Sequence, residues 1–324
     1  MNKKILITGG AGYVGSHICK KLSQTGFEPI VFDNLSRGNK WAVKWGELIV
    51  GDLFDKLTID STLEKISPVA IVHLAAFADI GESNLYPEKY YKNNVYSTLN
   101  LLESMIKNKL NNLVFSSSCS IYGNNDQKKI KESTSQNPLS PYAFSKSICE
   151  RLIIDIDKKY NLKYFILRFF NAAGADEDNE IGEKNLFHKR IIPEIIKTFL
   201  NKKKKLQIFG KDFDTIDGTC IRDYVHVQDL AEAHLQSIIY LLDKKRSEHI
   251  NIGSGYGHSI LEIVSKVKQI MKKDIDIEFC KKRSGDADHL VASIGKAKKV
   301  LKWYPKYSDL DNIIKTTLNW EKNN

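Results

Sequence analysis

Tyr142 and Lys146 stand four residues apart in the stretch SPYAFSK, residues 140–146. In an α-helix this spacing places two side chains on one face, one turn apart. Ser140 and Pro141 are residue types favoured at the N-cap and first position of a helix, so we expect a helix to begin here. The helix N-terminus and the ammonium group both favour an ionised phenol and would lower its pKa. A phenolate is a general base that can remove a proton from an alcohol while a hydride leaves.

The same spacing occurs a second time, in YLLDK, where Tyr240 precedes Lys244. This pair lies late in a helical pattern whose apolar residues predict a face turned to the core: Leu235, Ile238, Ile239 and Leu242. We interpret Tyr240 as a packing tyrosine and Lys244 as a solvated lysine. Spacing alone therefore does not separate the two pairs, whereas the helix start at Ser140 does.

A serine cluster supplies a second component of the expected chemistry. The stretch FSSSCSIYG, residues 115–123, ends a strand predicted at 112–118. Ser118 would then lie at the carboxyl edge of a sheet, where its hydroxyl group can bond both the tyrosine and a reacting oxygen. Three serines after a strand are more often loop chemistry, but here they precede the tyrosine by about 24 residues, and a glycine motif lies upstream.

Gly9, Gly12 and Gly15 form that motif, GxxGxxG, directly after a predicted strand. Glycines allow a tight turn and let the backbone approach a pyrophosphate at a helix N-terminus. Asp33 ends the next strand, where a carboxylate accepts hydrogen bonds from ribose hydroxyl groups and repels a 2′-phosphate. The sequence therefore predicts NAD binding, although Arg37 nearby leaves NADP open. Asp52 in GDL could cap the adenine or simply begin a helix.

The elements that must position these residues alternate through the first half of the chain. Predicted strands cover 4–8, 29–33, 47–50, 69–75, 112–118 and 163–170, and predicted helices cover 12–25, 54–66, 85–109 and 141–160. Most strands are continuous apolar runs, which is typical of strands buried on both faces. The sequence therefore predicts an α/β fold, a Rossmann-type, doubly wound parallel sheet over residues 1–172.

Beyond about residue 172 the elements become shorter and mixed. We expect helices near 188–201, 228–243, 259–272 and 308–321, and strands near 206–209, 249–253 and 275–279. Residues 173–324 are thus predicted to form a smaller mixed α/β substrate domain at the carboxyl ends of the parallel strands, with the segment 225–253 returning to the first domain. Ligands of open α/β sheets bind at those ends.

Composition excludes several other classes of protein. The 324 residues are 42% hydrophobic and 27% charged, which is globular, and no apolar run approaches the roughly 18 residues of a membrane span. The net charge of +10 is spread over many lysines, and the densest run, at 202–205, suits a solvated helix end, so no nucleic-acid partner is expected. Five scattered cysteines without CxxC spacing predict neither a disulfide framework nor a metal site, and favour the cytoplasm.

At this point the chain resembles the extended short-chain dehydrogenase/reductases, and within them the UDP-glucose 4-epimerases. Beside the motifs above, the resemblance rests on DNLSRG (33–38), GES with YYKNNVYSTLNLL (81–102), LRFFNAAGA (167–175), IFGKDFDTIDGTCIRDYVHVQDLAEAH (208–234) and KRSGDADHLVAS (282–293). It implies a 4-epimerase of UDP-hexoses that uses NAD and a transient 4-keto sugar. Tyr142 would exchange the proton of the sugar 4-hydroxyl, with Ser118 and Lys146 assisting, and a homodimer would form through helices 85–109 and 141–160.

The resemblance also implies the binding residues. For the cofactor they are Gly9, Gly12, Tyr13, Val14, Gly15, Asp33, Asn34, Leu35, Ser36, Arg37, Gly38, Asp52, Leu53, Leu74, Ala75, Ala76, Asn93, Ser118, Tyr142, Lys146 and Phe170. For the UDP-sugar they are Ser118, Cys119, Ser120, Tyr142, Asn171, Arg190, Ile191, Gln207, Ile208, Phe209, Arg222, Arg283, Asp286 and Leu290. Two arginines among polar residues suit a diphosphate.

Departures from the family pattern leave alternatives open. Ala78 stands where many members have a lysine, so one cationic contact to NAD is missing. Arg190 occupies a position that is usually asparagine or histidine. Leu290 stands where some relatives have a tyrosine that narrows the sugar pocket, which leaves a UDP-N-acetylglucosamine 4-epimerase as an alternative. A UDP-pentose 4-epimerase is a further alternative. A nucleotide-sugar dehydratase is disfavoured, because Cys119 and Ser120 occupy the positions of its acidic pair. A non-catalytic NAD-binding protein would be expected to lack the tyrosine or the lysine.

Overall fold

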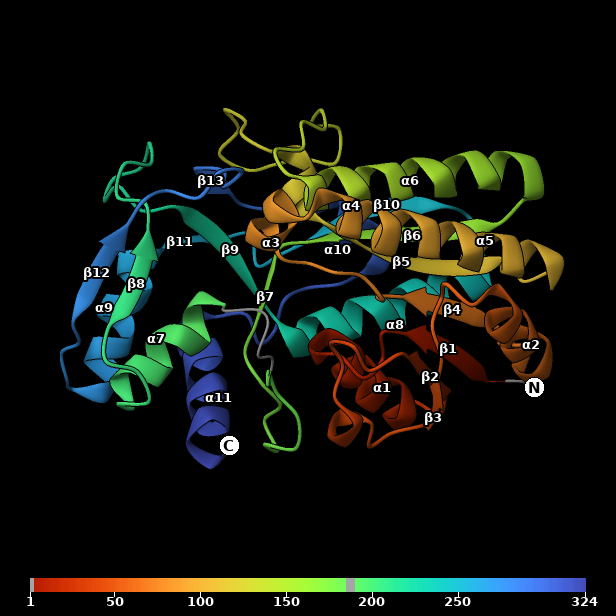
Figure 1. Ribbon diagram of the computed structural model, residues 1–324, viewed down its shortest axis with the longest axis horizontal. Helices are drawn as coiled ribbons and strands as arrows, with labels where there is room; N and C mark the ends of the chain where they lie inside the picture. The colour runs from red at the N-terminus through yellow and green to blue at the C-terminus, as the bar shows by residue number, and fades with distance from the viewer. Residues whose placement is uncertain (1–2, 185–189) are drawn as a thin grey trace.

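A parallel sheet of seven strands forms the larger part of the computed structural model, which describes residues 3–184 and 190–324 (Figure 1). The strands lie in the order β10 (Glu248–Ile252), β6 (Lys163–Phe169), β5 (Asn112–Ser118), β4 (Ala70–His73), β1 (Lys4–Thr8), β2 (Glu28–Asp33) and β3 (Glu47–Val50). The chain winds outward from β1 to β3 and then returns to place β4 on the other side of β1. This reversal is the switch point at which open α/β sheets bind ligands.

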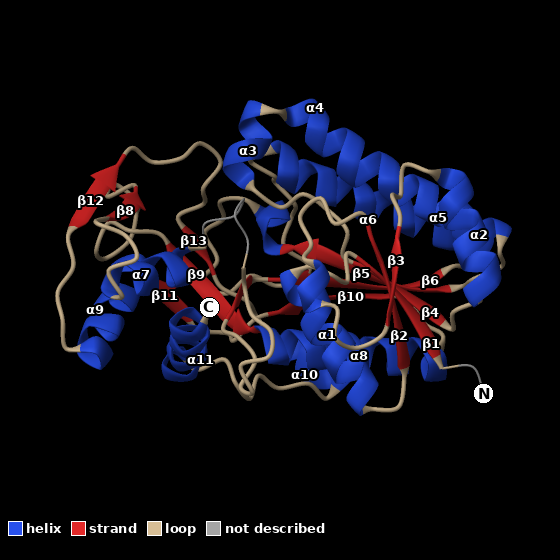
Figure 2. Ribbon diagram, turned by 60° about the horizontal axis from the view of Figure 1, so that its bottom comes forward, coloured by secondary structure: helices blue, strands red, loops and turns tan. Residues whose placement is uncertain are grey.

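Helices cover both faces of the sheet (Figure 2). One face packs against α1 (Tyr13–Gln24), α8 (Val227–Lys244) and α10 (Gly295–Leu301), and the other against α2 (Lys56–Ile66), α5 (Ser97–Lys107) and α6 (Pro141–Tyr160). Successive residues of β1 serve the two faces in turn, since Ile5 and Ile7 belong to one apolar core and Leu6 to the other. The continuous apolar runs thus correctly predicted strands β1 to β6 and the doubly wound fold.

The chain leaves this sheet after β6 and comes back to complete it. Helix α8 packs against α1, and β10 pairs in parallel with β6 at the edge of the sheet. Both elements fall within the segment 225–253. The division of the chain into a cofactor domain and a sugar domain stays a prediction.

The remaining elements surround a third apolar core. A small sheet joins β9 (Ile221–His226) to β7 (Asn171–Ala173), β11 (Gly257–Ser259) and β13 (His289–Leu290), while β8 (Leu206–Phe209) pairs with β12 (Ile277–Cys280). Helices α7 (Ile191–Phe199), α9 (Ile260–Met271) and α11 (Leu310–Asn323) pack beside them. The sequence predicted β8, β12 and these helices, but it missed β7, β9, β11 and β13. The predicted start of α7 at 188 lies outside the described residues.

The helix predicted over 85–109 is interrupted, and this prediction was wrong in part. A short α3 (Ile80–Leu85) comes first, and α4 (Pro87–Tyr90) then continues through a π-helical turn, Tyr91–Tyr96, into α5. Pro87 explains the break, because a proline excludes the α conformation from the residue before it. Tyr86 accordingly has φ −134° and ψ 65°.

Lys20 on α1 anchors the loop that follows β7. Its ammonium group lies 2.8 Å from carboxylate oxygens of Asp176, Asp178 and Glu180. These three carboxylates are close enough together to resemble a cation site, but the lysine nitrogen already bonds all three. Asp176 is almost completely buried, so its charge depends on this partner.

We predict that Lys20→Met lowers the free energy of unfolding by about 3 kcal/mol or more, because it leaves the Asp176 charge buried and unpaired. Urea unfolding would measure the loss. Lys21→Met is the matched control: the Lys21–Glu232 pair is partly exposed, so its loss is expected to cost less than about 1 kcal/mol. Equal losses in the two variants would contradict the prediction.

Candidate active site

The glycine motif forms a tight turn between β1 and α1. Gly9 has φ +74°, and a Cβ atom there would lie 2.7 Å from the backbone nitrogen of Ala75. A Cβ atom on Gly15 would lie 2.4 Å from the carbonyl oxygen of Gly9. Gly12 is the N-cap of α1 and has no side chain, so the first turn of this helix presents its backbone N–H groups to a ligand.

Asp33, at the end of β2, has its carboxylate fixed by the backbone. The N–H groups of Ala11 and Leu35 donate to its two oxygens at 3.0 Å and 2.8 Å. Burial raises the pKa of Asp33, and these two hydrogen bonds oppose the rise. A Cβ atom on Gly38 would lie 2.9 Å from both carboxylate oxygens, so glycine keeps this side of the group accessible. The arrangement can accept hydrogen bonds from a ribose.

Arg37 forms an ion pair with Glu82, so its charge is not reserved for an anionic ligand. Its guanidinium group donates to both oxygens of Glu82 at 2.8 Å and stacks on the ring of Phe77. Glu82 also accepts hydrogen bonds from Lys89 and from the hydroxyl group of Tyr90. Sequence reasoning missed this cluster, because a carboxylate 45 residues away gives no local signal of its partner.

Two adjoining cavities, of about 400 Å³ and 440 Å³, lie at the carboxyl ends of the large sheet. They share the lining residues Tyr13, Ala78, Ile80, Asn171, Ala172, Arg190, Arg222 and Asp286. Every residue predicted for the cofactor lines the first cavity except Leu35. The side chain of Leu35 instead packs against the apolar core that contains Ile5 and Ile7, and its φ is +59°. Only its backbone N–H group contributes to the site, by donating a hydrogen bond to Asp33.

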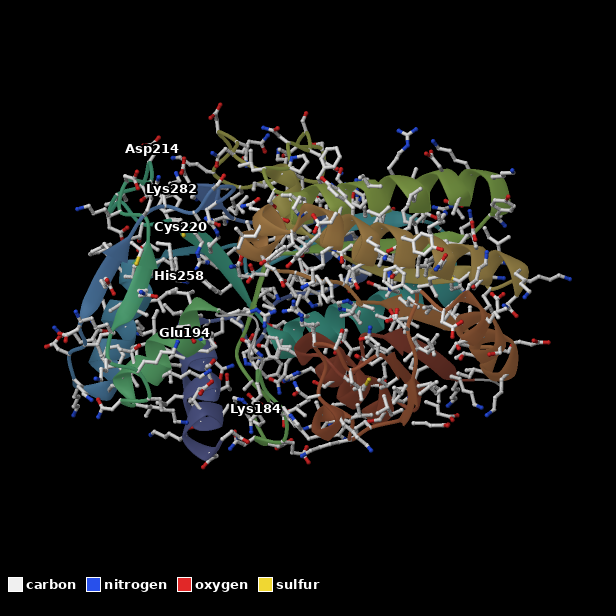
Figure 3. The ribbon with its side chains drawn as sticks, viewed as in Figure 1. Lys184, Glu194, Asp214, Cys220, His258 and Lys282 are labelled. Atoms are coloured by element: carbon white, nitrogen blue, oxygen red, sulfur yellow. The ribbon has the colours of Figure 1, made fainter. Side chains whose placement is uncertain are left out.

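The residues predicted for the sugar nucleotide also line these cavities. Ser118, Cys119, Ser120, Tyr142 and Leu290 belong to the first cavity, while Ile191, Gln207, Ile208, Phe209 and Arg283 belong to the second. Cys220 and Glu194, in the wall of the second cavity, and Lys184, in the wall of the first, come from well-separated parts of the chain (Figure 3). Which ligand each residue contacts stays a prediction.

The predicted start of α6 is present. The Ser140 hydroxyl oxygen accepts a hydrogen bond from the N–H group of Ala143, and Pro141 occupies the first turn beside Tyr142. Ser118 lies at the end of β5 and lines the first cavity together with Tyr142, and its hydroxyl group acts to lower the pKa of that phenol. Ser120 in turn donates to the Ser118 hydroxyl oxygen at 2.9 Å. Two linked serine hydroxyl groups therefore lie in the same cavity as the phenol.

Lys146 lies one helical turn after the tyrosine and is buried. Its ammonium group donates to the carbonyl oxygen of Ser116 at 2.8 Å and stands 4.8 Å from the centre of the Phe115 ring. Burial lowers the pKa of Lys146 to about 8. The carbonyl oxygen and the aromatic ring stabilise the ammonium charge, which water solvates poorly at this buried position.

The expected fall in the pKa of Tyr142 is contradicted. Burial raises it to about 12, and the hydrogen bond from Ser118 and the charge of Arg190 offset only part of this rise. The reason is that desolvation penalises a phenolate more than nearby dipoles and cations stabilise it. A positive group would have to bind next to the phenol to bring its pKa down.

The second cavity holds cations and one unpaired hydroxyl group. Arg222 lies on β9 and is buried, and Arg283 stacks on the ring of Phe209 at 3.8 Å. Tyr224 follows two residues after Arg222 on the same face of β9, and its buried hydroxyl group has no hydrogen-bond partner within the described chain. Sequence reasoning missed Tyr224, although recognising β9 as a strand would have placed it beside Arg222.

We predict that Lys146→Met changes the pH dependence of stability. Because the pKa of Lys146 is lower in the folded state than when unfolded, burying its charge destabilises the fold below pH 8, and this penalty fades between pH 8 and 10.5. The stability of the methionine variant relative to the parent is therefore expected to fall by about 2 kcal/mol between pH 7 and pH 9.5. Urea unfolding at both pH values would measure it. A difference that does not change with pH would contradict the low pKa.

Comparisons with known proteins agree with this geometry. The "UDP-glucose 4-epimerase" of Rhizobium meliloti is 42% identical over 98% of this chain and 97% of its own length. A crystal structure of UDP-glucose 4-epimerase from Brucella ovis in complex with NAD superposes with a TM-score of 0.94 and 40% identity, covering 98% of each chain. The enzyme from Bifidobacterium longum in complex with NAD+ and UDP also gives 0.94, at 31% identity, covering 99% of this chain and 98% of that one. A family profile matches residues 5–253. The chain belongs to the NAD dependent epimerase/dehydratase family.

Proposed function

We propose that this protein is an NAD-dependent UDP-glucose 4-epimerase, which interconverts UDP-glucose and UDP-galactose through a 4-keto sugar. The observation that carries the proposal is the position of Tyr142. Tyr142 lines the first cavity together with Ser118, Lys146, Arg190 and Arg222, and the two arginines also line the second cavity. A phenol in the cavity that also contains the glycine turn and Asp33 can exchange a proton with a sugar that lies beside the cofactor.

NAD fits the first cavity on two observations. The N-terminus of α1 is shaped by glycines at which a Cβ atom would clash, and the Asp33 carboxylate is held for ribose hydroxyl groups. When bound, NAD supplies a hydride acceptor and, in its oxidised form, a positively charged ring. Arg37 is engaged by Glu82, which supports NAD over NADP.

Each residue of the centre has a proposed role. Tyr142 takes the proton of the sugar 4-hydroxyl and later gives it back, while Ser118 aligns that hydroxyl and stabilises the phenolate. Lys146 keeps a positive charge near the phenol, held by the Ser116 carbonyl oxygen. Arg222 and Arg283 suit the two phosphates of a nucleotide diphosphate, and Tyr224 can donate its unpaired hydroxyl group there.

The alternatives are less well supported. A dehydratase needs an added acid and base, whereas Cys119 and Ser120 follow Ser118, and burial raises the pKa of the Cys119 thiol to about 12. Leu290 bears on an N-acetylhexosamine substrate, and a UDP-pentose is a separate alternative. Leu290 is packed in an apolar cluster with Cys119, Phe170 and Ala287, and relatives from two Rhizobium species carry the name UDP-glucose 4-epimerase. These observations favour the hexose.

We further propose a homodimer in the cytoplasm. Helices α5 and α6 lie side by side on one surface (Figure 1), and Tyr96 and Phe144 expose about half of their area there. All five cysteines lie in the described part of the chain and none is paired, which suits a reducing compartment. In residues 3–184 and 190–324, the helices are too short or too polar to cross a membrane.

Tyr142→Phe is expected to lower kcat for conversion of UDP-galactose to UDP-glucose by at least about 100-fold, because it removes the general base. The assay would contain no added reductant, so that product formation separates epimerisation from net oxidation. Tyr240→Phe is the matched control, since this tyrosine shares the YxxxK spacing but packs edge-on against Phe165. Turnover that survives in the Tyr142 variant would overturn the proposed catalytic role.

A further inference from the structure

Two tryptophans from opposite ends of the chain stack on each other. Trp41 lies in a short turn, Lys40–Ala42, that follows β2, and Trp320 lies on α11, the last helix. Their ring centres are 5.7 Å apart, and the ring planes are inclined to each other by 24°. Stacked aromatic rings at such a separation attract each other beyond the effect of the area that they bury. The pair therefore ties the segment after β2 to the C-terminal helix.

Trp320 also holds a second segment, which follows β7. Its indole N–H group donates to the carbonyl oxygen of Glu183 at 2.9 Å. A Cβ atom on Gly182 would lie 2.4 Å from the indole ring, so the ring lies directly against the backbone of this glycine. Helix α11 accordingly stands beside the loop that follows β7 (Figure 1). One side chain thus contacts both Trp41 and residues 182–183.

The two segments form part of the outer wall of the first cavity. Asn39, Trp41, Gly182 and Lys184 all line this cavity, and Trp41 keeps 38% of its surface exposed. Asn39 lies next to the glycine turn, since its backbone N–H group donates to the carbonyl oxygen of Ala11 at 2.9 Å. The wall therefore stands beside the place expected for the pyrophosphate of NAD.

The two segments also contact each other directly, but these contacts are exposed. The side-chain amide of Asn39 donates to the carbonyl oxygen of Lys184 at 3.1 Å, and the Lys184 ammonium group lies 6.0 Å from the centre of the Trp41 ring. Exposure to solvent limits what such contacts contribute. Trp320 is almost completely buried and lines neither cavity formed by the described residues. It therefore supports the wall from behind, without lining the space that the cofactor would fill.

We propose that Trp41 and Trp320 form a clasp that controls the exchange of NAD. The clasp holds residues 39–41 and 182–184 together, and the cofactor enters and leaves the first cavity when the stack opens. Because both rings belong to the protein, the stack forms with and without NAD and slows entry and exit alike. The clasp concerns how long the cofactor stays and not the chemistry of the sugar, so it goes beyond the proposed function.

Release of NAD is measured first, without any sugar. Protein loaded with NAD is mixed with a large excess of NADH, whose fluorescence changes as it replaces the departing cofactor. Trp41→Ala and Trp320→Leu each remove the stack, so dissociation of NAD is expected to be about 3- to 10-fold faster in both variants than in the parent. Trp41→Phe keeps an aromatic ring against Trp320, and its rate is expected to stay within about twofold of the parent.

Entry of the cofactor gives the second measurement. The association rate of NADH with cofactor-free protein is expected to rise by a similar factor, so that Kd for NADH stays within about threefold of the parent. Trp45→Ala is the matched control. Trp45 lies four residues after Trp41 and is partly buried beside Lys20, but it lines neither cavity formed by the described residues. Both rates are expected to remain within about twofold of the parent in this variant.

Three results would overturn the clasp: unchanged dissociation in Trp41→Ala, faster dissociation with unchanged association, or equal acceleration in Trp45→Ala. The second would make Trp41 an ordinary binding contact, and the third would indicate a general loosening of this segment. If Trp320→Leu does not fold, Trp41→Ala still decides, because this side chain is partly exposed. A parent that fails to interconvert the two sugars would disprove the proposed function and leave these rates unaffected.

Discussion

Tyr142 and Lys146 stand where water is largely excluded, and burial works against the ionised form of each. It raises the pKa of the phenol to about 12 and lowers that of the ammonium group to about 8. Neighbouring groups offset part of the cost of burying these two charged forms. A carbonyl oxygen and an aromatic ring stabilise the lysine charge, and the Ser118 hydroxyl group lowers the pKa of the tyrosine in part. Because little water reaches the site, these interactions are stronger than they would be in solution. They are also needed, because water does not solvate the charges there.

The parallel sheet brings these groups together. β1, β2 and β5 all end at one edge, so the glycine turn, Asp33 and Ser118 converge although they lie far apart in sequence. α6 then crosses that edge with its N-terminal turn, and β9 adds Arg222 and Tyr224 from the second cavity. The strands therefore position the groups that line the two adjoining cavities.

Local patterns predicted much of this arrangement. Continuous apolar runs predicted the six strands from β1 to β6, and the Ser-Pro start of α6 located the tyrosine. The missed strands β7, β9, β11 and β13 are short or lie in polar sequence, and they are strands only because they pair with one another. The pKa of Tyr142 was mispredicted for a related reason: sequence shows which charges are close along the chain but not how much water is lost. Glu82 and Asn94 contact residues 17 to 51 positions away, which no local pattern predicts.

The late return of β10 has a consequence for how the chain assembles. β6 ends at residue 169, but the strand that covers its outer edge is not complete until residue 252. On a growing chain, β6 is therefore an open edge while more than half of the apolar core that contains Ile5 and Ile7 is still to be made. Exposed strand edges are sites of mispairing. Since synthesis proceeds at about 5–20 residues per second, this interval lasts several seconds. The protein is thus most exposed to aggregation during translation, after its cofactor-binding strands have been made and before its sheet is closed.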